Sequence, residues 1–251
     1  MFTEESRPLS DGSWESNFKI HSYEADFTTR ASLPALFRFM QEAAWQHASH
    51  HQIGYADLIE NNQVWVLTGI TVQLSQTPFW EDSIKVKTWA RGTDRLFALR
   101  DFTFFNAKNE KFINAKSHWI VVNVETKRPQ RLDPFLNKMP LVEEKAIEET
   151  FHSVCNFTES VLLEHRKVRV SDVDVYGHMN NTRYIEWVTD TFSSDDYANL
   201  NISFLEVHFL KEALPDSDLT IWKQQKDNML YFAIKDKSGK LEHCRIILTT
   251  V

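Results

Sequence analysis

The pattern of apolar and polar positions occurs twice along this chain. Segments 72–86 and 207–221 align without a gap, and each contains an alternating strand, a turn with proline and acidic residues, and a second alternating strand. Two further alternating stretches follow in each half, at 97–105 and 115–123 in the first and at 230–235 and 244–249 in the second. We therefore predict about four antiparallel strands in each half.

One amphipathic helix is predicted upstream of each set of strands. In the first half, apolar residues recur with helical spacing over about residues 34–51. Ser32 suits the N-cap of this helix, and Pro34 occupies an early position where its missing N–H costs nothing. In the second half, the helix is expected to begin near Asn180 or Asn181 and to end near residue 191.

A sheet of this size must bury one face, and the single helix of each half is the available cover. We therefore predict an α+β fold of the tandem (double) hot-dog type, in which each curved antiparallel sheet wraps around one long helix. The expected division is an N-terminal hot-dog domain at 1–135, an acidic linker at 136–160 and a C-terminal hot-dog domain at 161–251. Two such units can pair their sheets edge to edge. A single α+β domain with an accidental repeat is the alternative.

Composition and charge narrow the class of protein. The 251 residues are 42% hydrophobic and 25% charged, and the net charge of −7 argues against nucleic-acid binding as the main function. The two cysteines, Cys155 and Cys244, lack metal-type or disulfide-type spacing and are expected to be reduced thiols. We find no signal-peptide pattern and no apolar run of about 18 residues, so we expect a cytoplasmic protein without a membrane span.

The turn before the second helix holds the densest group of polar and titratable residues. It follows a strand-like stretch at 167–170 and contains Asp172, Asp174, Gly177, His178 and the asparagine pair at 180–181. Polar groups between a strand and a buried helix are costly unless they are hydrogen-bonded or used in chemistry. We interpret Asp172 as a turn carboxylate outside any site. Asn180 is either an N-cap or a site residue.

At this point the chain resembles the acyl-acyl-carrier-protein thioesterases, which are double hot-dog proteins. The turn fits the wider hot-dog thioesterase pattern through Asp172-x-Asp174-x-x-Gly177-His178-x-Asn180-Asn181-x-x-Tyr184. Segments 30–44 and 206–213 are also similar to the family, the latter to a strand that supplies a further acidic residue. The resemblance implies a thiolester hydrolase with catalytic residues at Asp174, His178 and Glu212. We add Asn180 as a further candidate for the catalytic site.

Two positions depart from the family pattern. Tyr176 stands where plant members have asparagine, and Ala213 stands where some plant members carry a cysteine. A cysteine nucleophile therefore has no counterpart here, and Tyr176 is expected to pack. A structural role for His178, or a solvated Glu212 paired with Lys211, remains the alternative interpretation of those two residues.

Thioester hydrolysis needs an activated water or a carboxylate nucleophile, together with N–H donors for the oxyanion. We expect Asp174 to activate water, directly or as a transient anhydride, and Glu212 to share the base role or orient the water. The backbone N–H groups of Gly177 and His178 are the expected oxyanion donors, since they lie at the turn into a helix. His178 and Asn180 would orient the carboxylate or the water.

No cofactor or metal is expected. Three histidines at one helix end, His47, His50 and His51, have two members at i and i+4, but no third ligand follows at a usual spacing. A solvated helix end is the favoured interpretation of this cluster.

In the first half, the stretch equivalent to the motif is 27–33, which contains hydroxyl side chains and an arginine. We therefore expect the first half to lack counterparts of Asp174 and His178. It would then be free to host the acyl chain. The candidate lining residues are Phe37, Met40, Ala44, Trp45 and Trp65.

The resemblance implies fatty acyl-acyl carrier protein as the substrate and partner, with its phosphopantetheine-linked chain, and free fatty acid as the product of this step in fatty acid biosynthesis. An acidic carrier protein calls for basic residues at the entrance. The candidates are Arg91, Arg95, Arg100, Arg166, Lys167 and Arg183. Acyl-coenzyme A hydrolysis and acyl-chain binding without turnover are the alternatives, and a homodimer is open.

Overall fold

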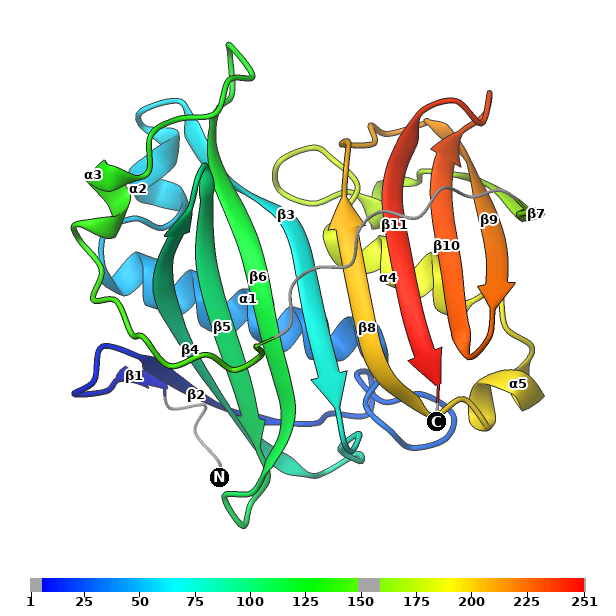
Figure 1. Ribbon diagram of the computed structural model, residues 1–251, viewed down its shortest axis with the longest axis horizontal. Helices are drawn as coiled ribbons and strands as arrows, with labels where there is room; N and C mark the ends of the chain where they lie inside the picture. The colour runs from blue at the N-terminus through cyan, green and yellow to red at the C-terminus, as the bar shows by residue number, and fades with distance from the viewer. Residues whose placement is uncertain (1–5, 149–158, 251) are drawn as a thin grey trace. The chain divides into compact units, whose positions relative to one another are not determined.

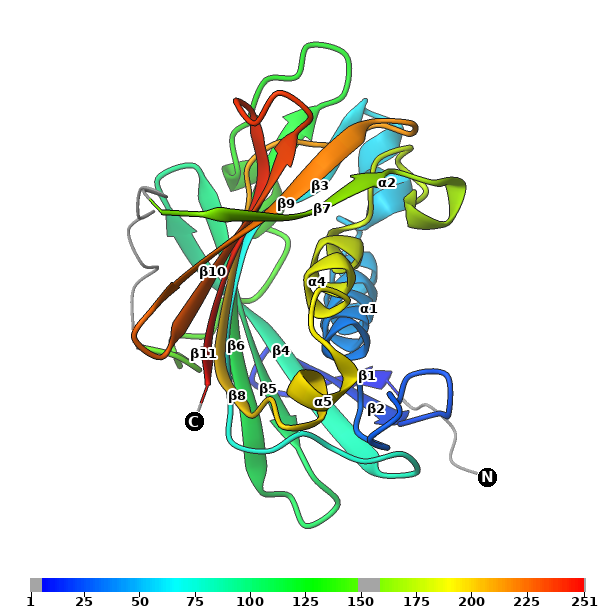
Figure 2. The same cartoon turned by 90° about the vertical axis from the view of Figure 1, so that its right-hand side faces the viewer.

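The computed structural model describes residues 6–148 and 159–250, and the chain divides into two compact units between Glu149 and Thr150 (Figure 1). In each unit, a long helix lies against one face of an antiparallel sheet (Figure 2). This is the α+β arrangement predicted from the repeat. Cys155 lies outside the described residues.

The N-terminal unit contains six strands in the order β1-β2-β4-β5-β6-β3. Its elements are β1 (Ser6–Pro8), β2 (Trp14–Lys19), α1 (Leu33–His50), α2 (Tyr55–Ile59), β3 (Gln63–Leu74), β4 (Ser83–Asp94), β5 (Phe97–Phe105), β6 (Lys111–Asn123) and α3 (Asp133–Leu136). Ser32 caps α1 as predicted, because its Oγ accepts a hydrogen bond from the N–H of Ala35 at 3.3 Å. One face of α1, which includes Phe37, Met40 and Ala44, is buried.

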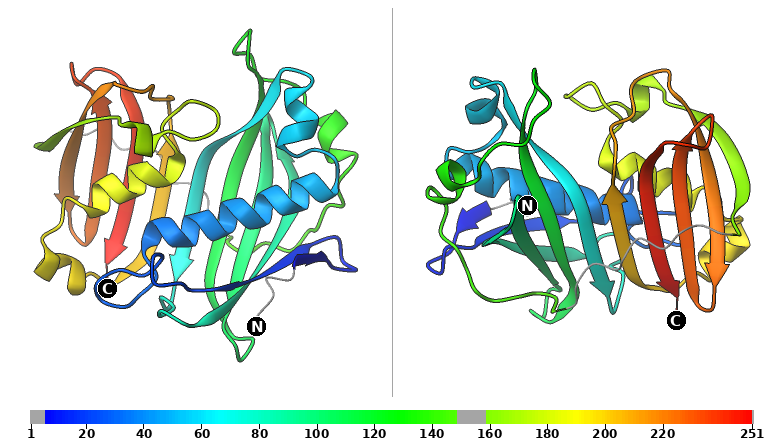
Figure 3. Two further views of the ribbon diagram at one scale, coloured as in Figure 1. Left: turned by 180° about the vertical axis from the view of Figure 1, so that it is seen from behind. Right: turned by 45° about the horizontal axis from the view of Figure 1, so that its top comes forward.

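The C-terminal unit contains five strands in the order β8-β11-β10-β9-β7. Its elements are β7 (Val161–Lys167), α4 (Asn181–Thr189), α5 (Ser194–Ala198), β8 (Ile202–Phe209), β9 (Asp218–Lys226), β10 (Met229–Asp236) and β11 (Glu242–Thr250). Residues Val170–Asp172 form a short 3-10 turn, so the predicted strand at 167–170 in fact ends at Lys167. Figure 3 shows α4, like α1, on the helix-covered side of its own sheet.

The predicted gapless repeat is confirmed in the backbone. β3 ends at Leu74 and β4 begins at Ser83, and at the same offset β8 ends at Phe209 and β9 begins at Asp218. Each connecting turn has a left-handed residue at the same place, Glu81 with φ 71° and Asp216 with φ 65°. The two halves therefore share turn geometry as well as strand register.

Most of the described part of the expected linker packs on the N-terminal unit. Met139 and Ile147 are buried, and the N–H of Val142 donates to the carbonyl of Ala90 at 2.9 Å. The stretch carries several glutamates and no regular alternation of apolar residues, which is why its pattern resembles a linker. Among the described residues, no helix has the combination of length and apolar character that crossing a membrane requires.

Candidate active site

The loop between β7 and α4 holds Asp174 in a closed turn. The N–H of Asp174 donates to the carbonyl of His178 at 2.9 Å, and the N–H of Gly177 donates to the carbonyl of Asp174 at 3.0 Å. Gly177 has φ 77°, a left-handed conformation that glycine adopts without strain. The N–H of Tyr176 donates to Oδ1 of Asp174 at 2.9 Å and so fixes one carboxylate oxygen.

Two further polar residues of the motif have structural contacts. Oδ2 of Asp172 accepts from the N–H of Arg169 at 2.8 Å, which confirms the interpretation of Asp172 as a turn carboxylate. Oδ1 of Asn180 accepts from the N–H and the hydroxyl of Thr182 at 2.9 and 2.8 Å. Asn180 is therefore the N-cap of α4.

The turn after β8 places Glu212 beside this loop. That strand ends at Phe209, so Glu212 is a turn residue rather than the strand residue expected from the sequence. The N–H of Met179 donates to the carbonyl of Ala213 at 2.9 Å, and Nε2 of His178 lies 3.2 Å from Oε2 of Glu212. Both side chains are accessible, 27% for His178 and 45% for Glu212, as a site open to substrate requires.

One of the two N–H groups expected to serve as oxyanion donors is engaged within the turn. Because the N–H of Gly177 closes the turn onto the carbonyl of Asp174, it is not available to a substrate, and its assignment as an oxyanion donor is wrong. Within residues 6–148 and 159–250, the N–H of His178 donates no hydrogen bond. That group remains at the positive end of α4 as one donor.

Tyr184, in the first turn of α4, is a buried part of the motif to which the sequence assigned no role. Its hydroxyl makes no hydrogen bond of ordinary geometry with any group of the described residues. Burial raises the pKa of Tyr184, and the charges of Cys244, Asp174 and Glu212 raise it further, against the effect of the Ala213 backbone. The hydroxyl therefore stays protonated.

The N-terminal unit contains the same loop, which corrects the expectation that it has no counterpart of Asp174. The N–H of Asp26 donates to the carbonyl of Arg30 at 2.8 Å, and the N–H of Thr29 donates to the carbonyl of Asp26 at 3.0 Å. Oδ1 of Asp26 accepts from the N–H of Thr28 at 2.8 Å, as Oδ1 of Asp174 does from Tyr176. Asp26 is thus the equivalent of Asp174, with Arg30 in the place of His178.

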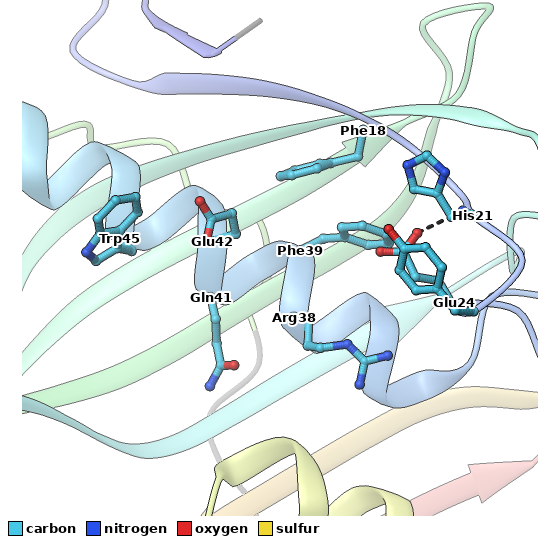
Figure 4. A pocket seen from close by; sticks show the side chains of 9 residues that line it. Phe18, His21, Glu24, Arg38, Phe39, Gln41, Glu42 and Trp45 are labelled. Carbon is cyan, nitrogen blue, oxygen red and sulfur yellow. Dashed lines mark hydrogen bonds between the residues drawn. The ribbon is translucent and has the colours of Figure 1, made fainter. Parts of the chain in front are cut away.

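The residues expected to line an acyl site do not all come together. Phe37, Met40 and Ala44 are buried on one face of α1, whereas Trp45 is 52% exposed. Trp45 instead lines an open pocket along α1, shown in Figure 4. The other residues of that pocket are Phe18, His21, Tyr23, Glu24, Arg38, Phe39, Gln41 and Glu42.

Trp65 belongs to a different part of the core. Its Nε1 donates to the carbonyl of Ile53 at 2.9 Å, and its ring packs edge-on against Phe135. Trp65 therefore contributes to the packing around α2 and α3 rather than to a lining with Met40.

The expected solvated helix end is wrong for one member of the histidine cluster: His50 is exposed, but His47 is buried against the sheet. Nη1 of Arg100 lies 3.0 Å from Nδ1 of His47, and burial, followed by the charge of Arg100, lowers the pKa of His47 to about 2. Arg100 is itself buried and so cannot serve as an entrance cation. No group of three or more potential metal ligands is found in the part of the chain that the structure describes.

Most of the other entrance candidates are in ion pairs. Arg91 pairs with Asp101 at 3.0 Å, and Arg183 pairs with Glu186 at 2.6 Å. Arg166 contacts both Glu164 and Asp190, and Lys167 lies 3.8 Å from Asp216. These pairs reduce the positive charge that Arg91, Arg166, Lys167 and Arg183 offer to an acidic partner. Arg95 has no ion pair among the described residues.

Comparisons with known proteins agree with this architecture. Family models described as the acyl-ACP thioesterase N-terminal and C-terminal domains match residues 11–138 and 157–247. The chain is 26% identical over 219 residues to a chloroplastic palmitoyl-acyl carrier protein thioesterase of Gossypium hirsutum, which covers 81% of this chain and 52% of that protein. The chain spans about half the length of the curated relatives it matches.

Several solved structures match nearly the whole chain, and two of them are acyl-ACP thioesterases from a bacterium and a plant. An acyl-ACP thioesterase from Bacteroides thetaiotaomicron superposes with a TM-score of 0.87 at 24% identity, covering 97% of this chain and 100% of that one. The 12:0-ACP thioesterase from Umbellularia californica superposes with a TM-score of 0.85 at 21% identity, covering 97% and 98%. These similarities confirm the predicted double hot-dog fold.

Proposed function

Because this chain belongs to the acyl-ACP thioesterase family, we propose that it hydrolyses the thioester of fatty acyl-acyl carrier protein and releases the free fatty acid. The observation that carries the proposal is the convergence of Asp174, His178 and Glu212 in one unit. The turn fixes one oxygen of Asp174, and Glu212 lies 3.2 Å from His178. A module that only binds an acyl chain has no need of this arrangement.

In the proposed reaction, Asp174 takes a proton from a water molecule as the water oxygen attacks the thioester carbonyl carbon. The N–H of His178, at the start of α4, stabilises the negative charge that develops on the carbonyl oxygen. The tetrahedral intermediate then expels the thiolate by breaking the C–S bond, and the proton held by Asp174 neutralises the leaving sulfur. His178 holds the carboxylate of Glu212 beside the water.

The proposed substrate class follows from the relatives. The protein of Gossypium hirsutum is named for palmitoyl-acyl carrier protein, and we extend carrier-protein recognition to this chain. Acyl-coenzyme A carries the same thioester, and hydrolysis of that substrate is the competing activity. We also propose that the reaction takes place in the cytoplasm, which cysteines without disulfide-type spacing support.

The test uses a panel of acyl-carrier-protein and acyl-coenzyme A thioesters of several chain lengths. We expect faster turnover of the carrier-protein series, and Asp174→Asn should lower kcat by about 100-fold or more. Asp26→Asn is the matched control, because Asp26 occupies the same turn in the other unit and accepts the same type of backbone hydrogen bond.

Full turnover by Asp174→Asn would refute the assigned mechanism. Equal losses in Asp174→Asn and Asp26→Asn would show a structural effect of the turn rather than chemistry at Asp174. A preference for the coenzyme A series would replace the carrier protein as the substrate.

A further inference from the structure

Exposed apolar side chains lie on both segments that bring His178 and Glu212 together. The loop before α4 and the turn after β8 are joined directly, because the N–H of Met179 donates to the carbonyl of Ala213 at 2.9 Å. Each segment presents large apolar side chains to solvent, with exposed fractions between 40% and 82%. We call these four residues the rim: Val175, Tyr176, Leu210 and Leu214. Apolar side chains that gather at an exposed site are typical of a contact surface.

One exposed cation lies on each of the same two segments. Arg169 begins the loop, where its N–H donates to Oδ2 of Asp172, and Lys211 directly precedes Glu212 in the turn. Neither side chain has an ion pair with any residue of the described ranges 6–148 and 159–250. The charge of both cations is therefore available to a partner, in contrast to the paired cations described above.

The carboxylates of the two segments do not cancel this positive charge. Asp172 is buried and accepts a backbone N–H of its own turn, and Asp216 lies 3.8 Å from Lys167. The other two carboxylates, Asp174 and Glu212, belong to the proposed reaction centre. The unpaired charge that these segments offer outside the reaction centre is therefore positive.

The N-terminal unit shares the apolar tips but not these two cations. His21 stands at the position of Arg169, since its N–H also donates to the carboxylate three residues ahead, at 2.8 Å. Gln76 stands at the position of Lys211 in the gapless repeat. Exposed apolar side chains recur in the equivalent loop and turn, at Phe27 and Phe79. Cations at these two positions thus occur only in the unit that carries the catalytic candidates.

We propose that the rim, together with Arg169 and Lys211, is the surface on which the acyl carrier protein docks. This inference rests on the proposed function. A thioester held at Asp174 is tethered to its carrier protein by the phosphopantetheine arm, so the carrier protein must lie on the surface within reach of that residue. The carrier protein is acidic, and its carboxylates pair with the two cations while its apolar side chains cover the rim. Coenzyme A has no protein surface that could cover the rim.

Charge reversal at Lys211 tests this surface with two substrates. One is the carrier-protein thioester, and the other is the same acyl chain on pantetheine, which keeps the thioester but lacks the carrier protein. Lys211→Glu should lower kcat/KM about 10-fold for the first and less than about 2-fold for the second. Arg169→Glu should show the same difference between the substrates. Lys226→Glu is the matched control, because Lys226 is exposed at the opposite end of the same sheet, and it should keep both rates (Figure 1).

Salt and an apolar substitution provide two further measurements. Between about 0.02 M and about 0.3 M NaCl, kcat/KM of the unchanged protein for the carrier-protein thioester should fall about 5- to 10-fold, and that of Lys211→Glu should fall less. Leu214→Asp should raise KM for the carrier-protein thioester, because it puts a carboxylate on the rim. Phe79→Asp, at the equivalent turn position of the other unit, should leave this KM unchanged.

A binding measurement separates this inference from the proposed function. Carrier protein with the arm but without an acyl chain should bind Lys211→Glu about 5-fold or more weakly than it binds the unchanged protein. An unchanged Kd, or equal losses of turnover with both substrates, overturns the docking surface and leaves hydrolysis standing. A loss with the coenzyme A thioester alone also overturns it, since the cations then bind the phosphates of coenzyme A. Binding that depends on Lys211 without turnover of any thioester overturns the proposed function instead.

Discussion

The buried imidazole of His47 is expected to set the acid limit of folding stability in the N-terminal unit. His47 is 1% exposed, and the guanidinium of Arg100 donates to its Nδ1, which requires a neutral ring. Burial is the largest cause of its lowered pKa, and the charges of Arg100, His51 and His50 add to it. The pKa falls from 6.5 to about 2 in the folded protein.

The sign and the size of the effect follow from linkage. Below pH 6.5 the unfolded chain binds a proton at His47, whereas the folded chain stays neutral there until about pH 2. The contribution of His47 to stability is therefore complete above pH 6.5 and decreases as the pH falls through this window. One proton changes the free energy of unfolding by about 1.4 kcal/mol per pH unit, so acidification from pH 8 to pH 5 costs about 2 kcal/mol.

The assay is urea unfolding of the full chain at pH values between 8 and 5, with His47→Gln as the variant. Glutamine does not titrate and offers Arg100 an amide oxygen as acceptor. We expect the variant to be less stable at pH 8 and the deficit to shrink by about 2 kcal/mol at pH 5. His165→Gln, at an exposed position on β7, should follow the unchanged protein. Parallel pH curves for His47→Gln and the unchanged protein would refute the reasoning.

Two further substitutions test the assignments around the helices. Asn180→Ala should lower the free energy of unfolding by about 1 kcal/mol. Asn180→Ser should lose much less, because serine also caps helices. A stable but inactive Asn180→Ser would show that Asn180 has a chemical role besides the cap. Met40→Trp enlarges a buried side chain on α1 and should shorten the preferred acyl chain in the thioester panel, while Trp45→Met, at an exposed position, should leave the preference unchanged. Unchanged preference in Met40→Trp would separate α1 from chain-length selection.

The strands were predictable from the sequence because alternation is a local signal. The strand predicted at 97–105 has those bounds in β5, and the gapless pairing of segments 72–86 and 207–221 persists in the turns. The burial of His47 was also predictable from the sequence, because Met40, Ala44 and His47 follow helical spacing on the buried face of α1. The cluster of three histidines obscured that signal.

The equivalence of Asp26 and Asp174 could not be found by a gapless comparison. α1 has 18 residues and α4 has 9, so the register before the helices differs from the register after them. The engagement of the Gly177 N–H and the missing partner of Tyr184 depend on the folded backbone and on packing. Neither property can be inferred from the types or the spacing of the residues.

The paired loops have a consequence for how the two halves of this chain can diverge. Thr29 has φ 64° where Gly177 has φ 77°, so the turn persists at this position without glycine. The backbone hydrogen bonds to Asp26 and Asp174, rather than the residue at the left-handed position, hold the conformation. If turnover depends on the loop of Asp174 alone, selection constrains the side chains of that loop. The side chains of the Asp26 loop can then change freely, provided that the same backbone hydrogen bonds still form.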